Sequence, residues 1–109
     1  MSIPPSFCII YVTFPGKEEA EAALFLLIQE RLVACGNIIE RVKSVYQWKG
    51  AIESAQECIL LMKTRSENYS RVEKRIAEIH SYENPCIFKI GLDSVFAPYA
   101  QWIQDETEI

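Results

Sequence analysis

The chain has 109 residues, half of them hydrophobic, and a net charge of −4. This length suits one domain, and the apolar content is sufficient for a hydrophobic core. The acidic balance argues against a general nucleic-acid-binding protein, which needs a basic surface to neutralise phosphates. No segment is long and apolar enough to span a bilayer, so we expect neither nucleic acid nor membrane as a partner.

The first residues and the cysteines bear on the cellular compartment. Residues 1–6 lack the basic segment of a secretion signal, and the apolar run Phe7–Val12 is shorter than a signal core. The four cysteines are widely spaced, stand in apolar surroundings and form no C-x-x-C motif. We therefore expect reduced thiols in a cytoplasmic protein rather than a disulfide framework. These residues are Cys8, Cys35, Cys58 and Cys86.

A strand and a helix are expected at the start of the chain. Phe7–Thr13 is a continuous apolar run that ends before Pro15 and Gly16, which predicts a central strand covered on both faces. Residues 17–35 follow with apolar residues at helical spacing and glutamates in the first turns. We expect Gly36 to cap the C-terminus of this helix.

Residues 37–64 predict a hairpin of two long strands, with its tip at Lys49-Gly50-Ala51. A three-residue tip, which we favour, sets Lys43 opposite Glu57 as a cross-strand charge pair. A two-residue tip would instead set Glu57 beside Val42. A β-bulge in strands of this length can also shift the register.

The length of this hairpin indicates that it protrudes. Residues 37–49 span roughly 43 Å at about 3.3 Å per residue, whereas a domain of this size has a diameter of roughly 34 Å. The tip carries Tyr46, Trp48 and Ile52, and apolar side chains of this size are usually covered. We therefore expect another copy of the chain to cover them. The alternative is a bent hairpin that folds back on its own core.

The second half of the chain predicts a helix, a strand and a last helix. A capping box at Thr64–Glu67 opens a helix that runs to about His80. A turn over residues 81–85 leads to a strand at Cys86–Ile90. Asp93 and Ser94 are expected to cap a short terminal helix, whose apolar residues are Tyr99, Trp102 and Ile103.

The element order β-α-β-β-α-β, followed by a helix, predicts an α+β, ferredoxin-like domain over residues 1–109. In this fold the helices cover one face of a mainly antiparallel sheet. The other face also needs a cover, which is a second reason to expect an oligomer.

Five motifs together resemble one known family. Glu30–Ile38 resembles its E-R-L-x-A-C-x-N-I, Ser44–Gly50 its S-x-Y-x-W-x-G, Glu57–Thr64 its E-x-x-L-x-x-K-T and His80–Pro85 its H-x-Y-E-x-P. Tyr99 and Trp102 resemble a closing Y-x-x-W. The motifs occur in family order and spacing along essentially the whole chain. This sequence is therefore similar to the CutA-type divalent-cation tolerance proteins.

The resemblance implies a tight homotrimer in which the long hairpins pair between subunits. This trimer would be similar in architecture to the nitrogen-regulatory signal-transducer trimers. It also implies a role in tolerance of divalent cations, notably copper, without an established reaction. We therefore expect a non-enzymatic protein that binds copper or another divalent cation weakly and has no organic cofactor. The alternative is a ligand-sensing trimer that binds a small molecule in an inter-subunit cleft.

The resemblance also suggests where a metal binds. Bacterial members of the family have a three-position metal site, which maps onto Val12, His80 and Cys86 of this sequence. Only the histidine is retained, although a cysteine at the third position can bind soft copper. We predict a weak metal site of His80 and Cys86, with an oxygen of Glu83 as a further donor. The competing interpretation is that His80 caps its helix and Cys86 is buried.

Other residues are candidates for the subunit interface or an inter-subunit cleft. They are Tyr46, Trp48, Lys63, Tyr82 and Trp102.

Two other protein classes share the predicted element order. RNA-recognition modules carry aromatic and basic residues on the third strand, whereas residues 58–62 are C-I-L-L-M here. A ferredoxin-like phosphatase needs an arginine-bearing anion loop after the first strand, and Thr13–Gly16 contains no arginine. The sequence also has no P-loop and no G-x-G-x-x-G motif. Enzymatic activity is therefore not expected.

Overall fold

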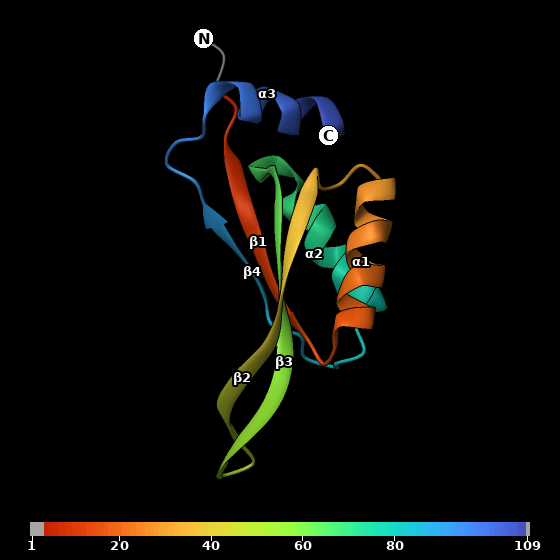
Figure 1. Cartoon of the computed structure of the whole chain (residues 1–109), viewed down its shortest axis with the longest axis vertical. Coiled ribbons are helices and arrows are strands. Elements are labelled where there is room, and N and C mark those ends of the chain that lie inside the picture. The colour runs from red at the N-terminus through yellow and green to blue at the C-terminus, as the bar shows by residue number, and fades with distance from the viewer. Residues whose placement is uncertain (1–3, 109) are drawn as a thin grey trace.

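Runs of apolar and β-branched residues build a four-stranded antiparallel sheet. The computed structural model describes residues 4–108 (Figure 1), so the interpretation of residues 1–6 lies partly outside the described residues. The strands lie side by side in the order β2-β3-β1-β4. They are β1 (Phe7–Phe14), β2 (Cys35–Trp48), β3 (Ala51–Arg65) and β4 (Ile87–Gly91).

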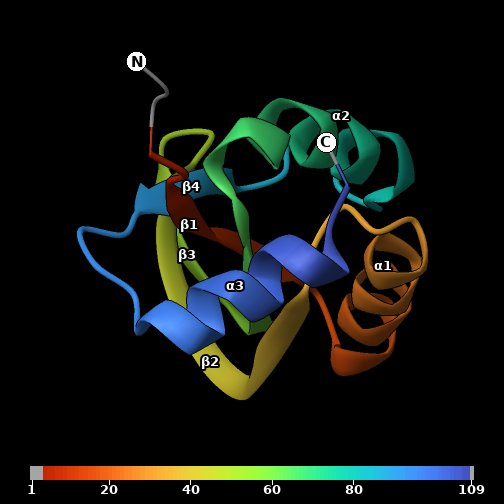
Figure 2. The ribbon, with the colours of Figure 1, turned by 90° about the horizontal axis from the view of Figure 1, so that it is seen from above.

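Three α-helices complete this α+β fold, in the predicted element order. Helices α1 (Lys17–Gln29) and α2 (Tyr69–Ile79) both lie on one side of the sheet, and α2 follows a 3-10 turn, η1 (Ser66–Asn68) (Figure 1). Helix α3 (Ala97–Glu106) crosses the end of the sheet opposite the hairpin tip, as Figures 1 and 2 show. None of the helices among residues 4–108 is long and apolar enough to cross a membrane.

The core lies between the sheet and the first two helices. Alternate side chains of β1, from Cys8 to Phe14, are fully buried there with Leu60 and Met62 of β3. The opposite face of the sheet is partly open: Tyr11 stacks on Phe88 with ring centroids 4.6 Å apart, and Phe88 itself is exposed. Strand β1 is a central strand, as expected, and within the single chain its second face is only partly covered.

The hairpin of β2 and β3 protrudes, as its length predicts. Strand β1 ends where Phe14 pairs with Cys58, so the hairpin continues beyond the sheet as a two-stranded arm (Figure 1). The molecule measures 51 × 26 × 22 Å along its principal axes. Trp48 and Ile52 near the tip are 53% and 73% exposed. The arm does not fold back on the core.

The tip has two residues rather than three. Trp48 pairs with Ala51 and Tyr46 with Glu53. Lys49 and Gly50 have φ values of 49° and 83°, and a two-residue turn with positive φ at both positions matches the twist of antiparallel strands. The prediction of a three-residue tip, which we favoured because it pairs Lys43 with Glu57, is therefore wrong.

A bulge then resets the register nearer the sheet. Val42 pairs with Glu57 and Ile39 with Ile59, with an irregularity between them where Arg41 has a φ of 60°. The extra residue bends and twists β2 where the arm leaves the sheet. Lys43 faces Gln56, so the expected pair of Lys43 with Glu57 does not form.

The first helix ends six residues earlier than expected. The N–H of Leu32 donates to the carbonyl of Leu27, and the N–H of Arg31 to that of Ile28, each at 3.0 Å. With Arg31 at a φ of 59°, this is a Schellman termination. The prediction that Gly36 caps the helix is wrong: it lies in β2, where a Cβ would meet a methyl of Leu24 at 2.7 Å.

The predicted caps of the later helices are also wrong. The hydroxyl of Thr64 donates to the carbonyl of Leu32 at 2.6 Å instead of capping a helix, so α2 begins only at Tyr69. Helix α3 begins after Phe96, without a side-chain cap, rather than at Asp93 and Ser94. In both places a tertiary contact or a longer loop overrides the local signal.

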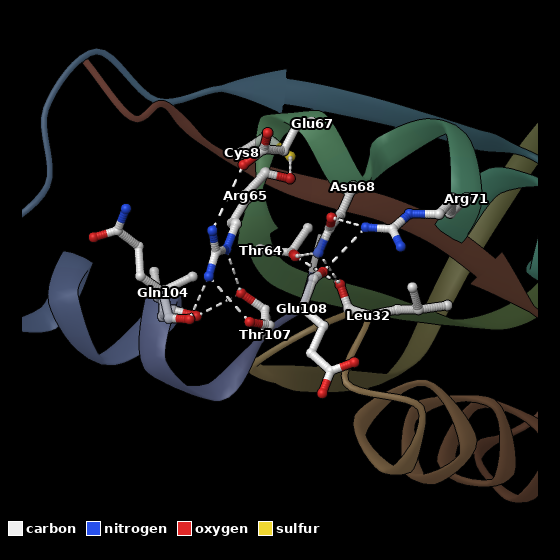
Figure 3. Close-up of polar contacts among 11 residues, drawn as sticks. Cys8, Leu32, Thr64, Arg65, Glu67, Asn68, Arg71, Gln104, Thr107 and Glu108 are labelled. Atoms are coloured by element: carbon white, nitrogen blue, oxygen red, sulfur yellow. Dashed lines mark hydrogen bonds and ion pairs between the residues drawn. The ribbon is translucent and has the colours of Figure 1, made fainter. Parts of the chain in front are cut away.

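Arginines hold the C-terminal end of α3 (Figure 3). Arg65 donates to the carbonyls of Gln104 and Thr107 at 2.6 and 3.0 Å and to the hydroxyl of Thr107 at 2.9 Å. Arg71 donates to the carbonyl of Glu108 at 3.0 Å. The last carbonyls of a helix have no partner within it, and the guanidinium groups supply one. These bonds join α3 to the end of β3.

Candidate functional site

A cavity of about 770 Å³ lies on the open side of the sheet, where the arm begins. Strand β1 contributes Tyr11, β2 contributes Tyr46 and Trp48, and the loop before β4 contributes Tyr82. The alternation of side chains along a strand sets Tyr46 and Trp48 on the same face of the arm. Strand β3 contributes Glu53 and Glu57, so the cavity joins β1, the β2–β3 hairpin and the loop before β4.

The structure brings together some of the predicted interface residues and separates others. Tyr46, Trp48 and Tyr82 all line the cavity. Lys63 does not: its Nζ donates to Oδ1 of Asn37 at 2.7 Å. Trp102 also lies elsewhere, on α3, with its ring 5.5 Å from that of Tyr99.

His80 is positioned as a structural residue. Its ring is stacked on Phe14 at 4.4 Å, and the residue is only 9% exposed. Nε2 lies 2.8 Å from the carbonyl oxygen of Thr13, and the N–H of Tyr82 donates to Nδ1 at 3.0 Å. Because a carbonyl only accepts, Nε2 carries the hydrogen in this neutral ring. Both nitrogens are therefore engaged, and a metal would have to displace one of these bonds.

The predicted metal donors are not gathered into one site. Glu83 and Cys86 line the cavity, whereas His80 does not. Residues 4–108 contain no group of three or more histidine, cysteine, aspartate or glutamate side chains placed to hold a metal ion. Cys86 is exposed, which excludes the interpretation that it is buried. Metal binding by these residues stays a prediction.

Partial desolvation and a nearby charge shift the pKa of the Cys86 thiol. Desolvation raises its pKa, the negative charge of Glu57 raises it further, and a hydrogen bond with Thr13 lowers it. Because the pKa is raised, Cys86 is a protonated thiol near neutral pH, and a metal must displace this proton to bind. Any metal bound there is therefore held less tightly than by an activated thiolate.

Glu57 is a site residue that sequence reasoning placed in a structural charge pair. It is 9% exposed and lines the cavity. The hydroxyl of Tyr82 donates to its Oε2 at 2.8 Å. Burial, this bond and the charge of Glu57 raise the pKa of Tyr82 to about 12. The two-residue tip, which was the alternative register, pairs Glu57 with Val42 and Lys43 with Gln56. Glu57 is therefore not paired with Lys43.

Two residues of β1, Tyr11 and Thr13, also line the cavity and were missed. Their spacing along the strand was a signal for a shared face, because side chains two apart point the same way. The continuous apolar run concealed it, since residues on both faces are apolar. The resulting site offers aromatic rings, hydroxyls, carboxylates and one exposed thiol, which are groups suited to binding.

Known proteins resemble this chain along nearly its whole length. Residues 8–106 match the family described as CutA1 divalent ion tolerance protein. The divalent-cation tolerance protein CutA of Pyrococcus horikoshii is 39% identical over 100 residues, which cover 92% of this chain and 97% of that protein. Human protein CutA is 30% identical over 106 residues, covering 97% of this chain and 59% of the human protein.

Solved structures agree with the sequence relatives. The CutA1 structure from Ehrlichia chaffeensis has a TM-score of 0.92 and 29% identity, covering 98% of this chain and all of that chain. The structure of the CutA protein from Archaeoglobus fulgidus, described as a periplasmic divalent cation tolerance protein, has a TM-score of 0.91 and 37% identity, covering 94% and 99% of the two chains. The chain belongs to the CutA1 divalent ion tolerance protein family.

Proposed function

We propose that this ferredoxin-like chain assembles as a homotrimer that serves in tolerance of divalent cations without catalysing a reaction. Family membership supports the cation role, and the names of the relatives describe tolerance rather than a reaction. The proposed metal is copper, bound weakly. No organic cofactor and no nucleic acid are included in the proposal.

The exposed apolar side chains of the arm and the open sheet face support assembly. Val45, Trp48 and Ile52 on the arm are each more than half exposed, and Phe88 and Ile90 on β4 are 43% and 46% exposed. Side chains of this kind and number are typically covered in an oligomer. Light scattering at low micromolar concentration tests this. We expect three times the 12.5 kDa chain mass; a monomer would exclude the trimer.

The observation that carries the copper proposal is the exposed thiol of Cys86 in a cavity made acidic by Glu57. The thiol is the soft donor that copper prefers among the cavity residues. Glu83, on the same cavity wall, supplies the proposed oxygen. The raised pKa of Cys86 supports weak binding, since the proton must leave first. His80 enters this site only if it gives up a hydrogen bond.

Calorimetric titration of the reduced protein with Cu(I) and with Zn(II) tests the metal site. We expect Cu(I) to bind more tightly, because closed zinc sites usually require four ligands. Cys86→Ser should abolish the Cu(I) heat, and His80→Ala should weaken it if the ring coordinates. Cys35→Ser, which changes a thiol that contacts Tyr99 instead, is the matched control. Equal binding by all variants, or none by the wild type, would refute the site.

A ligand-sensing function is the second candidate. The cavity wall contains more aromatic rings and hydroxyls than metal donors, and its volume of about 770 Å³ lies in the range of small-molecule sites. In a trimer this cavity would lie between subunits. A screen of small organic ligands against the metal-free protein tests this candidate.

We also propose a cytoplasmic location. All four cysteines are unpaired, which suits a reducing compartment. The Archaeoglobus fulgidus relative is described as periplasmic, so fractionation of the native host is the deciding experiment. Recovery of the protein outside the cytoplasm would overturn this part of the proposal.

A further inference from the structure

The cavity beside the arm has an aromatic and acidic wall. Three phenol rings line it, those of Tyr11, Tyr46 and Tyr82. Its charged lining residues are all acidic, Glu53 and Glu57 on β3 and Glu83 in the loop before β4. No lysine, arginine or histidine of the described chain lines it. A site of this composition attracts cations and repels anions.

Glu57 is a buried carboxylate without a cationic partner among residues 4–108. It is 9% exposed and accepts a hydrogen bond from the neutral hydroxyl of Tyr82. No ion pair within 4.0 Å in the described part of the chain includes it. Buried charges in proteins are normally paired. The two-residue tip sets Lys43 opposite Gln56, which removes the nearest expected partner.

Two basic residues lie on a different cavity. Lys17 and Arg41 line a space of about 280 Å³ together with Glu18 and Glu40. Glu57 borders this space as well but forms no ion pair with either basic side chain. The larger cavity is the one in which Glu57 meets aromatic rings.

The negative charge of Glu57 raises the pKa of two neighbouring tyrosines. Burial and then Glu57 raise the pKa of Tyr82 to about 12. Burial, Cys86 and Glu57 raise that of Tyr11. In each case the negative charge opposes formation of a second anion in the cavity. The same field favours a bound cation.

We propose that this cavity binds a primary organic ammonium ion, with its N–H groups on the Glu57 carboxylate and its carbon body against the rings of Tyr11, Tyr46 and Tyr82. A charged N–H donor forms a strong hydrogen bond with a carboxylate, and aromatic rings attract cations and bury hydrocarbon. The volume of about 770 Å³ exceeds what a single metal ion fills. This inference deepens the ligand-sensing function proposed for the same cavity. It does not require Cys86, so it can be tested separately from copper binding.

Isothermal titration of the full-length protein with three isosteric probes, in EDTA and reductant, tests the inference. The probes are 2-phenylethylammonium, neutral 2-phenylethanol and anionic phenylacetate. We expect the ammonium ion to bind with one site per chain and the alcohol to bind at least about tenfold more weakly, because it lacks the charge-assisted bond. Phenylacetate should give no binding.

Variants locate the site. Glu57→Gln should weaken binding of the ammonium probe at least about tenfold and remove its advantage over the alcohol. Glu21→Gln on α1, outside the cavity lining, is the matched control and should bind as the wild type does. Because EDTA keeps the protein free of metal in this titration, the result does not depend on whether the copper site exists.

Three results would overturn the inference. Equal binding of the ammonium ion and the alcohol would show a merely apolar pocket. Unchanged binding by folded Glu57→Gln would place the probe elsewhere. No binding by the wild type would show that the cavity is filled or that a neighbouring copy neutralises Glu57. The wild-type comparison of the three probes decides the matter even if Glu57→Gln fails to fold.

Discussion

The hydroxyl of Tyr82 donates a 2.8 Å hydrogen bond to the carboxylate of Glu57. Tyr82 belongs to the loop before β4, and Glu57 lies on β3 where the protruding arm begins. The backbone N–H of Tyr82 is held in turn by Nδ1 of His80. The single histidine therefore positions the tyrosine, and the tyrosine ties the loop to the arm.

This bond predicts an alkaline loss of stability. The pKa of Tyr82 is raised from its usual 10 to about 12 in the folded chain. The folded state thus favours the protonated phenol, so the stabilisation is fully present below pH 10 and is lost as the pH rises from 10 to about 12. Tyr82→Phe should unfold more easily at pH 7, by on the order of 1–3 kcal/mol.

Denaturant titrations between pH 7 and pH 12 check this prediction. The difference between Tyr82→Phe and the wild type should shrink as the pH rises. Tyr46→Phe is the control, because Tyr46 lines the same cavity without the bond to Glu57. A difference that is constant with pH would mean that the phenol titrates normally and that the bond contributes little.

Trp48→Ala is expected to weaken assembly more than it weakens the isolated fold. Trp48 is 53% exposed on the arm and outside the core between the sheet and the helices, and tryptophan is a favoured interface anchor. Truncation of a buried aromatic typically costs about 3–5 kcal/mol. Sedimentation on dilution should show dissociation of this variant at concentrations where the wild type stays assembled.

The matched control for Trp48 is Phe25→Ala, since Phe25 is 68% exposed on α1, a helix that lies beside the sheet and is not part of the arm (Figure 1). It should leave the assembly intact. If Trp48→Ala stays fully assembled yet melts much earlier than the wild type, Trp48 serves the fold of the single chain and not the interface.

Arg65→Ala should destabilise the chain through α3. Arg65 makes three hydrogen bonds to Gln104 and Thr107, and its side chain is 17% exposed. Removing it leaves partly buried acceptors unsatisfied, at a cost of about 1–3 kcal/mol in free energy of unfolding. Arg75→Ala is the control, because the pair of Arg75 with Glu30 is more exposed and exposed pairs contribute about 0–1 kcal/mol. Equal losses in chemical denaturation would contradict a special role for Arg65.

The sequence predicted the elements of the fold better than their boundaries. Apolar periodicity and the long β-branched segment were sufficient for the element order and for the protruding hairpin. The end of α1 was not predicted because Arg31, at a φ of 59°, occupies a position where glycine is the usual signal. The register was not predicted because Lys49 and Arg41 also adopt positive φ, a conformation that is not expected for lysine or arginine.

The candidate site was predicted in part. Tyr46, Trp48, Tyr82, Glu83 and Cys86 do line one cavity, as motif resemblance suggested for several of them. The engagement of His80 on both nitrogens was not predictable, because it depends on the carbonyl of Thr13, 67 residues away in the sequence. The separation of Glu57 from Lys43 follows from the two-residue tip, which the sequence offered only as the alternative register.

Native mass spectrometry of the reduced protein with added Cu(I) tests the central claim most directly, because one spectrum reports the assembly and its metal content. We predict a trimer of the 12.5 kDa chain that takes up no more than one weakly held copper ion per chain, and a Cys86→Ser trimer that takes up none. A monomeric wild type, or copper uptake that Cys86→Ser leaves unchanged, would contradict the claim.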